Sequence, residues 1–363
     1  MKESLDVVFC NLMRVGLGLS QSFSYALTEG EWLSIFKMAK QQTVLGVVYN
    51  AIARLPLELR PPRLLTIRLS GAVESIRGMN CQMNRAAARY TQLFEERGLR
   101  SVILKGQANA RLYPDTLSRQ AGDIDIWIPG GYDIVERQLL DMGLISEGRD
   151  SYRVSHHIGF RDESGIEIEV HHRPAELPFR NGEFQKTLLA EFENSVFTTE
   201  GFYAPSIRFA LLMQLQHLYY HCIREGVGLR HYMDYFVLLS HSSSDDRQFA
   251  WGKAKRFGLG HACAAIMWVL GEVFGLSRDL MLCSPDRCRG KRLYRECIAG
   301  GNFGRGAPQK KGRHPLIRWF GKRMHVLRWL TFDPLNIILS EVQYWKNTIS
   351  LIPERIKRRK AFL

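Results

Sequence analysis

The sequence predicts an α+β protein in which a small mixed sheet is flanked by N-terminal and C-terminal helical regions. Helical patterns of apolar residues fill residues 1–98 and return over residues 176–300. Residues 99–175 instead alternate apolar and polar side chains with the two-residue period of β-strands. Residues 301–363 form a basic, aromatic-rich extension. A chain of 363 residues is long enough for these four segments to make two or three structural units.

The first segment is expected to contain a capped helix followed by a long one. Thr28 and Glu31 have the spacing of a capping box, and apolar residues follow at helical intervals. Prolines at 56, 61 and 62 then break the pattern. It recovers over Leu64 to Arg97, which predicts a long helix.

The sheet is expected to begin with a strand that leads into a phosphate-binding turn. Residues 101–104 are an apolar run, Gly106 permits a tight turn, and residues 107–113 read as a short helix that starts at Gln107. Free backbone N–H groups at a helix start can hold a phosphate. Lys105, directly before the glycine, can neutralise its charge.

Two carboxylates alternate with large apolar residues in the next strand. Asp123 and Asp125 share one face, while the isoleucines between and after them point into a core. The alternative is a solvated edge strand. Trp127 and three isoleucines favour a buried strand, however, in which unpaired carboxylates are costly. We therefore interpret the two aspartates as functional.

A later strand repeats the alternation. Ile166 to His172 places Glu167, Glu169 and His171 on one face. If the two acidic strands are neighbours, three carboxylates meet at a sheet edge, where they repel one another unless a divalent cation lies between them. Two such metals can clamp the attacking and leaving oxygens of a phosphoryl or nucleotidyl transfer.

Two further elements complete the expected sheet. Tyr132 to Met142 should form the helix after the first acidic strand. Tyr152 to Phe160 reads as one strand that pairs with Ile166 to His172 across a hairpin turn at residues 162–165.

These motifs resemble a known family. The stretch resembles the uncharacterised bacterial nucleotidyltransferase family of the polymerase-β-like superfamily in its Leu104-Lys105-Gly106, Tyr113-Pro114-Asp115, Arg119, Gly122-Asp123-Ile124-Asp125 and Glu169-Val170-His171. Lys105-Gly106 stands where that superfamily more commonly has Gly-Ser or Gly-Gly.

The resemblance implies a metal-dependent enzyme that moves a nucleoside monophosphate from a nucleoside triphosphate such as ATP to an unidentified acceptor hydroxyl and releases pyrophosphate. Its implied catalytic and metal-binding residues are Asp123, Asp125 and Glu169, which would hold Mg²⁺ or Mn²⁺. The implied nucleotide-binding residues are Lys105, Gly106, Gln107 and Arg119, and possible cleft residues are His171, His217 and His221.

Several roles stay open. Residues 207–225 predict a helix in which His217 and His221, four apart, either pack in the core or line the cleft. Arg119 either pairs with Asp115 or contacts phosphate. The spacing of Arg230 and Asp234 is compatible with a salt bridge within one helix.

Composition narrows the setting. The N-terminus carries acids where a signal peptide has its basic region, and no apolar run is long enough to span a membrane. Seven cysteines, mostly inside helical patterns, indicate reduced thiols, and no matching His or Cys pair completes a zinc site with Cys283, Cys288 and Cys297. We therefore expect a cytoplasmic protein, peripheral at the inner membrane face if its tail binds lipid.

The charge is concentrated at the C-terminus. Residues 289–363 hold 18 Lys+Arg and 4 Asp+Glu, so the remaining 288 residues hold 32 of each and are neutral. The basic aromatic segment at residues 316–330 can lie on an anionic membrane, contact RNA, or pack on the protein body. The rival functions are accordingly an RNA-directed nucleotidyltransferase and a non-catalytic module that binds a membrane or partner.

Overall fold

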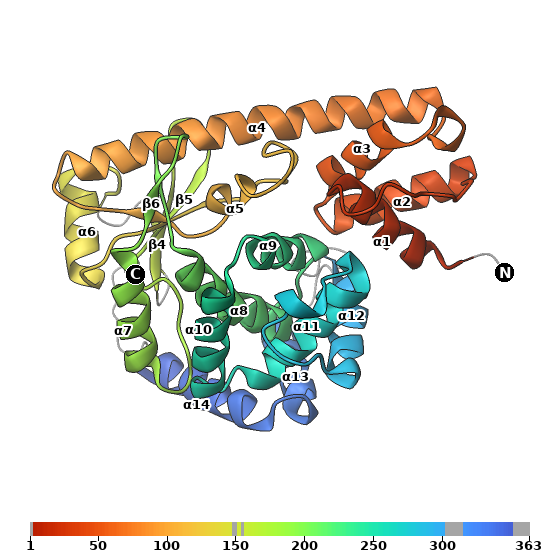
Figure 1. The fold of residues 1–363 in the computed structure, drawn as a ribbon. Helices are drawn as coiled ribbons and strands as arrows, with labels where there is room; N and C mark the ends of the chain where they lie inside the picture. The colour runs from red at the N-terminus through yellow and green to blue at the C-terminus, as the bar shows by residue number, and fades with distance from the viewer. Residues whose placement is uncertain (1–2, 147–150, 154–155, 302–314, 351–363) are drawn as a thin grey trace.

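The computed structural model describes residues 3–146, 151–153, 156–301 and 315–350 (Figure 1). The predicted linker around residues 300–308 and the terminal Lys-Arg cluster therefore lie largely outside the described residues. Helices surround a small mixed sheet, which confirms the predicted fold class. The four segment boundaries stay a prediction.

The N-terminal region is helical, as predicted. Thr28 and Glu31 form a complete capping box at the start of α2. In Figure 1 the long helix α4 runs along the top of the molecule, over the N-terminal helices at one end and over the sheet at the other. The elements are α1 (Leu5–Gly16), α2 (Glu29–Gln41), α3 (Leu45–Arg54), η1 (Leu57–Leu59) and α4 (Arg63–Glu95).

The sheet has five strands in the order β1-β2-β5-β4-β3. Strands β2 and β5 are parallel neighbours, and the remaining pairs are antiparallel. The strands are β1 (Val102–Ile103), β2 (Ile124–Trp127), β3 (Ser151–Arg153), β4 (His157–Arg161) and β5 (Glu167–His171), and the helices between them are α5 (Gln107–Ala110) and α6 (Tyr132–Asp141).

One expectation about the sheet is wrong. Tyr152 to Phe160 is not a single strand. It contains parts of the antiparallel strands β3 and β4, with Tyr152 opposite Gly159. Of these two strands, only β4 pairs with β5, across the predicted turn at residues 162–165. The apolar and polar alternation continues from the first strand into the second, so the periodicity did not reveal that there are two strands.

The C-terminal half is helical apart from one two-stranded ribbon. Helices α8 and α9 lie beside the sheet, to its right and lower right in Figure 1, and α13 and α14 lie along the bottom of the molecule. The elements are α7 (Asn181–Phe192), β6 (Val196–Phe197), β7 (Tyr203–Ala204), α8 (Ile207–Arg224), α9 (Leu229–Ser240), α10 (Ser244–Arg256), α11 (Gly260–Phe274), η2 (Arg278–Leu280), α12 (Arg287–Gly300), α13 (Pro315–Leu327), η4 (Arg328–Thr331) and α14 (Pro334–Ser350).

Two buried apolar clusters hold these elements together. One joins the end of α4 to the sheet and α6, and the other joins the N-terminal helices to α8, α9 and α11. Trp127 on β2 belongs to the second cluster and stacks on Phe209 of α8, with ring centroids 5.4 Å apart. This contact brings one face of β2 against α8. Among the described helices, none combines the length and the apolar character required to cross a bilayer.

Candidate functional site

The two acidic strands are neighbours, and their carboxylates meet. Strand β2 pairs with β5 in parallel register, which places Asp125 opposite Glu169. Residues opposite each other in a sheet project from the same face, so the two side chains approach. Asp125 is buried and Glu169 is partly buried. The expected convergence of acids therefore exists for this pair.

Lys105 neutralises the buried aspartate. Its Nζ lies 3.0 Å from Asp125 Oδ2, at the point where the chain leaves β1 and turns toward α5. Burial on its own lowers the pKa of Lys105, but the carboxylates of Asp125, Asp123 and Glu169 outweigh it and raise that pKa above its usual value. Lys105 therefore carries a positive charge inside the site.

His171 contacts both carboxylates. Its Nε2 lies 3.0 Å from Asp125 Oδ1 and 3.6 Å from Glu169 Oε2. Burial alone lowers the pKa of His171, but its hydrogen bonds to Asp125 and Glu169 raise it to about 9. The ring is thus protonated at neutral pH and ties the two acids together.

Two more histidines border the site, and one of them, His157, lies next to Glu169. His157 Nε2 lies 3.5 Å from Glu169 Oε1, and the rings of His156 and His157 are 4.7 Å apart. Burial lowers the pKa of His157 to about 4 and that of His156 to about 2. Burial raises the pKa of Glu169, but His171 and His157 outweigh this effect and lower it to about 2. Glu169 is therefore ionised beside the neutral imidazole of His157.

Asp123 precedes β2 and lines the same cavity. The cavity measures about 410 Å³, and Asp123, Lys105, Asp125, Glu169 and all three histidines border it. Asp123, Lys105 and Asp125 also border a smaller recess of about 30 Å³ toward α9. The structure thus brings the three predicted acids to one cavity, where Asp125 and Glu169 share the closer contacts.

The donor atoms fit a divalent cation. Among the described residues, Asp125, Glu169 and His171 offer one ligand atom each, all within 4.8 Å of one another. Hard cations such as Mg²⁺ take carboxylate oxygens, and Asp123 lies beside this group on the same cavity wall. The set of acids is therefore suited to the cation that the sequence analysis expects.

Arg119 pairs with Asp234, and of the two roles left open for it the pair with Asp115 does not form. Its Nε and Nη2 each lie 2.8 Å from an oxygen of Asp234, and Tyr113 donates to the same carboxylate. Arg230 also lacks the expected ion pair with Asp234 and donates to the carbonyl of Gln120 at 2.7 Å. Arg119 therefore fastens the loop before Asp123 to α9.

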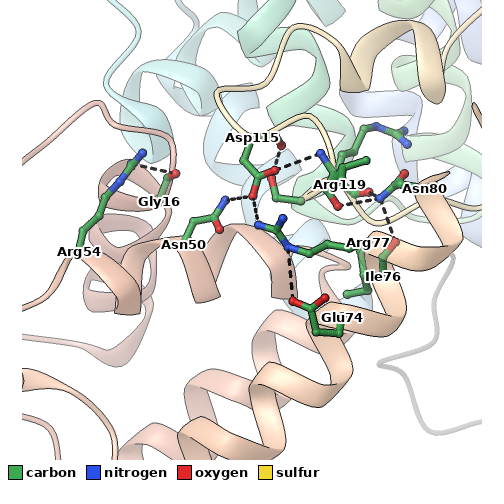
Figure 2. A network of polar contacts seen from close by, with 11 residues as sticks. Gly16, Asn50, Arg54, Glu74, Ile76, Arg77, Asn80, Asp115 and Arg119 are labelled. Carbon is green, nitrogen blue, oxygen red and sulfur yellow. Dashed lines mark hydrogen bonds and ion pairs between the residues drawn. The ribbon is translucent and has the colours of Figure 1, made fainter. Parts of the chain in front are cut away.

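Asp115 holds the same loop from the other side. Figure 2 shows its carboxylate between Asn50 of α3 and Arg77 of α4, both of which donate to it. Asn80 of α4 donates to the carbonyl of Arg119 at 2.7 Å. The loop that leads into β2 is thus bound to three helices, which fixes where Asp123 lies.

The predicted turn and the start of α5 have separate roles. Gly106 has φ +59, a conformation that favours glycine, and it stands directly before α5. Gln107 is buried and donates to Asn84 of α4, so its side chain contacts that helix and does not border the cavity. Gly106 borders the smaller recess.

The histidines of α8 lie at the cavity. His217 and His221 both border it, and His217 also borders the smaller recess. His221 Nδ1 lies 3.0 Å from Glu225 Oε2. Burial lowers the pKa of His217 well below its usual value, which keeps its ring neutral. Both histidines therefore have the cleft position that the sequence analysis left open.

Sequence reasoning missed His156 and His157. They lie outside the two stretches that carry the acidic pattern. The register of the β4–β5 hairpin brings them to the site, because it places His157 opposite His171. The sequence did contain a signal for His157. Counting residues outward along both strands from the turn at residues 162–165 places His157 opposite His171. Glu167 lies at the far end of β5 and pairs with Arg161 at 3.4 Å.

Comparison with known proteins places this geometry in context. A family model described as an uncharacterised nucleotidyltransferase matches residues 28–275. The crystal structure of an antigenic nucleotidyltransferase-like protein from Paracoccidioides brasiliensis is similar at 15% identity and a TM-score of 0.28, over 48% of this chain and 87% of that chain. No curated protein matches. The family match contains both acidic strands, Lys105 and α8, and ends before α12.

Proposed function

Because this chain belongs to the family of uncharacterised nucleotidyltransferases, we propose that it transfers a nucleoside monophosphate from a nucleoside triphosphate to an acceptor hydroxyl. The acceptor oxygen bonds to the α-phosphorus, the bond from that phosphorus to the β-phosphate oxygen breaks, and pyrophosphate leaves, while the hydroxyl proton passes to the pyrophosphate or to solvent. The observation that supports this most strongly is the arrangement of Asp125 opposite Glu169, with Lys105 and Asp123 on the same cavity wall.

Asp123, Asp125 and Glu169 are proposed to hold the divalent cation, Mg²⁺ or Mn²⁺. The cation, when bound, neutralises the triphosphate and stabilises charge on the attacking and leaving oxygens. Three carboxylates in one partly buried cavity repel one another, so their placement favours cation binding. Glu169 is ionised at neutral pH and can accept a hydrogen bond from the acceptor hydroxyl, which would orient it.

Lys105 is proposed to bind the phosphates. Its ammonium group is charged and lies at the cavity wall. There it can stabilise the negative charge that develops on the leaving pyrophosphate. Gly106 allows the backbone at the turn to approach the phosphates closely. Gln107 contributes by packing α5 onto α4.

Arg119 is proposed to act as a positioning residue. Its ion pair with Asp234 is buried, and it fixes the loop from which Asp123 projects. His217 and His221 form the α8 wall of the cavity and are proposed to contact the nucleotide or the acceptor.

A binding experiment tests the proposal without the acceptor. Thermal unfolding is followed with each of ATP, GTP, CTP and UTP, with and without Mg²⁺. We expect at least one nucleotide to raise the melting temperature by a few degrees in the presence of Mg²⁺, because a ligand at 100 times its Kd stabilises a protein by about 2.7 kcal/mol.

The variants identify the site. Asp123→Asn combined with Asp125→Asn should abolish the Mg²⁺-dependent shift, with folding checked by circular dichroism. Glu167→Gln is the matched control, since Glu167 lies on the same strand as Glu169 but pairs with Arg161 away from the cavity. The proposal is wrong if no nucleotide causes a shift, or if the double variant keeps it. Transfer of α-phosphate label to lysate fractions then identifies the acceptor.

A further inference from the structure

Three histidine rings converge where the β4–β5 hairpin borders the cavity. His156 lies directly before β4, His157 is the first residue of β4, and His171 is the last residue of β5. Their ring centroids are 4.7, 4.9 and 5.4 Å apart. One ring nitrogen from each lies within 4.8 Å of those of the other two. This trio is distinct in chemistry from the three acids of the proposed function.

The carboxylate of Glu169 lies next to one histidine of this trio. Glu169 Oε1 lies 3.5 Å from His157 Nε2. Two ligand atoms that each bind one metal at about 2.0–2.2 Å, in tetrahedral geometry, are separated by about 3.5 Å. The separation between Glu169 and His157 suits two ligands of one ion, but among the described residues Glu169 does not belong to the group in which the three histidines lie mutually close.

His171 is oriented as metal-bound histidines are. Its Nε2 bonds to Asp125 Oδ1 at 3.0 Å, and its Nδ1 is buried without a hydrogen-bond partner among the described residues. A carboxylate that holds one ring nitrogen fixes the ring and leaves the other nitrogen as a ligand once metal binding has displaced its proton. The ring is 4% exposed, and its unpartnered Nδ1 is available to a ligand.

Imidazole and carboxylate select different metals. Carboxylate oxygens suit Mg²⁺, whereas imidazole nitrogens suit zinc and other first-row transition metals. A buried histidine cluster can also be a packing feature, and the rings of His217 and His221 lie 4.3 Å apart with a tilt of 59° between their planes. Among the described residues, these two rings belong to no group of three or more potential ligands whose atoms lie within 4.8 Å of one another.

We propose that His156, His157 and His171 bind a divalent transition-metal ion of the zinc type, with the fourth position open to water or a ligand. The metal site itself does not depend on the proposed function. Only its role as the second ion of a nucleotidyl transfer rests on that function.

The test uses Co²⁺ and Zn²⁺ on the tag-free, metal-stripped full chain, without Mg²⁺ or nucleotide. Co²⁺ should give the visible ligand-field absorption of a four-coordinate nitrogen and oxygen site at one equivalent. Zn²⁺, titrated against a chromophoric chelator, should displace it. The substitutions His156→Ala and His157→Ala together should weaken Zn²⁺ binding at least 100-fold and remove the Co²⁺ bands.

Two controls separate metal ligation from packing. His172→Ala removes the next histidine along the chain, which is buried but packs edge-on against Tyr132, and should leave the Co²⁺ spectrum unchanged. His157→Gln keeps the size of the side chain and removes the ligand, so it should weaken Zn²⁺ binding even if the alanine variant folds poorly. Circular dichroism and melting temperature report folding in each case.

The outcomes are distinguishable from those of the proposed function. Absence of Co²⁺ bands in the wild type, or Zn²⁺ affinity that His157→Gln leaves unchanged, overturns the metal site. Asp123→Asn should keep the Co²⁺ bands while it weakens Mg²⁺-dependent nucleotide binding. If Co²⁺ binds as expected and no nucleotide does, the metal site stands and the nucleotidyl-transfer proposal fails.

Discussion

The buried ion pair of Arg119 and Asp234 gives a sharp prediction about stability. The side chains are 5% and 6% exposed and share two hydrogen bonds of 2.8 Å. Tyr113 adds a third bond, 2.6 Å long. Substituting Asp234→Asn leaves the guanidinium of Arg119 buried without a countercharge.

The magnitude follows from that burial. Removing one partner of a buried ion pair costs about 3–5 kcal/mol, because the remaining charge is uncompensated. Tyr113→Phe keeps both charges paired and removes one hydrogen bond to a charged group, which costs about 1.5–3 kcal/mol. We therefore expect Asp234→Asn to lower the free energy of unfolding by more than Tyr113→Phe does.

Urea unfolding at pH 7, followed by circular dichroism, measures both changes. The matched control is Glu193→Gln, because the pair of Arg100 and Glu193 is 36% and 76% exposed. That variant should stay within about 1 kcal/mol of the wild type. A loss below about 1 kcal/mol for Asp234→Asn would refute the assignment of this pair as a structural clamp.

The pH dependence has a defined sign. Burial alone raises the pKa of Asp234, but the charge and hydrogen bonds of Arg119 hold it below its usual value. A group whose folded pKa is depressed stabilises the protein fully above its unfolded pKa, about 3.9, and loses this as pH falls through the folded value. The difference in the free energy of unfolding between the wild type and Asp234→Asn should therefore decrease only at acidic pH.

Two further predictions concern packing and exposure. A Cβ at Gly46 would lie 2.2 Å from the carbonyl oxygen of Ser118, so Gly46→Ala should lose about 1–3 kcal/mol in urea unfolding. Gly71→Ala, in an open position of α4, should instead gain about 0.5–1 kcal/mol; equal effects of the two would contradict the contact. Ellman's reagent should modify the exposed thiols of Cys81 and Cys288 first, and the buried thiols only on unfolding. Rapid modification of every cysteine in the native protein would count against the buried positions.

The sequence was sufficient to predict those elements that the spacing of apolar and polar residues along the chain determines. Alternation in β2 and β5 predicted which side chains share a face, and the parallel register then set Asp125 opposite Glu169. The long helix α4, the capping box of α2 and the helix α8 also followed from spacing along the chain. In each case the determining contacts lie within one element or between adjacent strands.

Long-range partners could not be predicted in this way. Asp234 is 115 residues from Arg119, and a spacing of four to Arg230 suggested the wrong partner. The packing of α9 against the loop before β2 decides the pairing, and no local pattern encodes it. The same holds for His157 beside Glu169, which depends on the bend that divides residues 151–161 into two strands.

The most direct test of the account is a crystal structure with Mn²⁺ and a non-hydrolysable nucleoside triphosphate. Mn²⁺ replaces Mg²⁺ at carboxylate sites and is identified by its anomalous scattering. We predict an Mn²⁺ ion coordinated by Asp125 and Glu169 or Asp123, with the triphosphate beside Lys105. An ion and a nucleotide bound outside this cavity, away from all three carboxylates, would contradict the central claim.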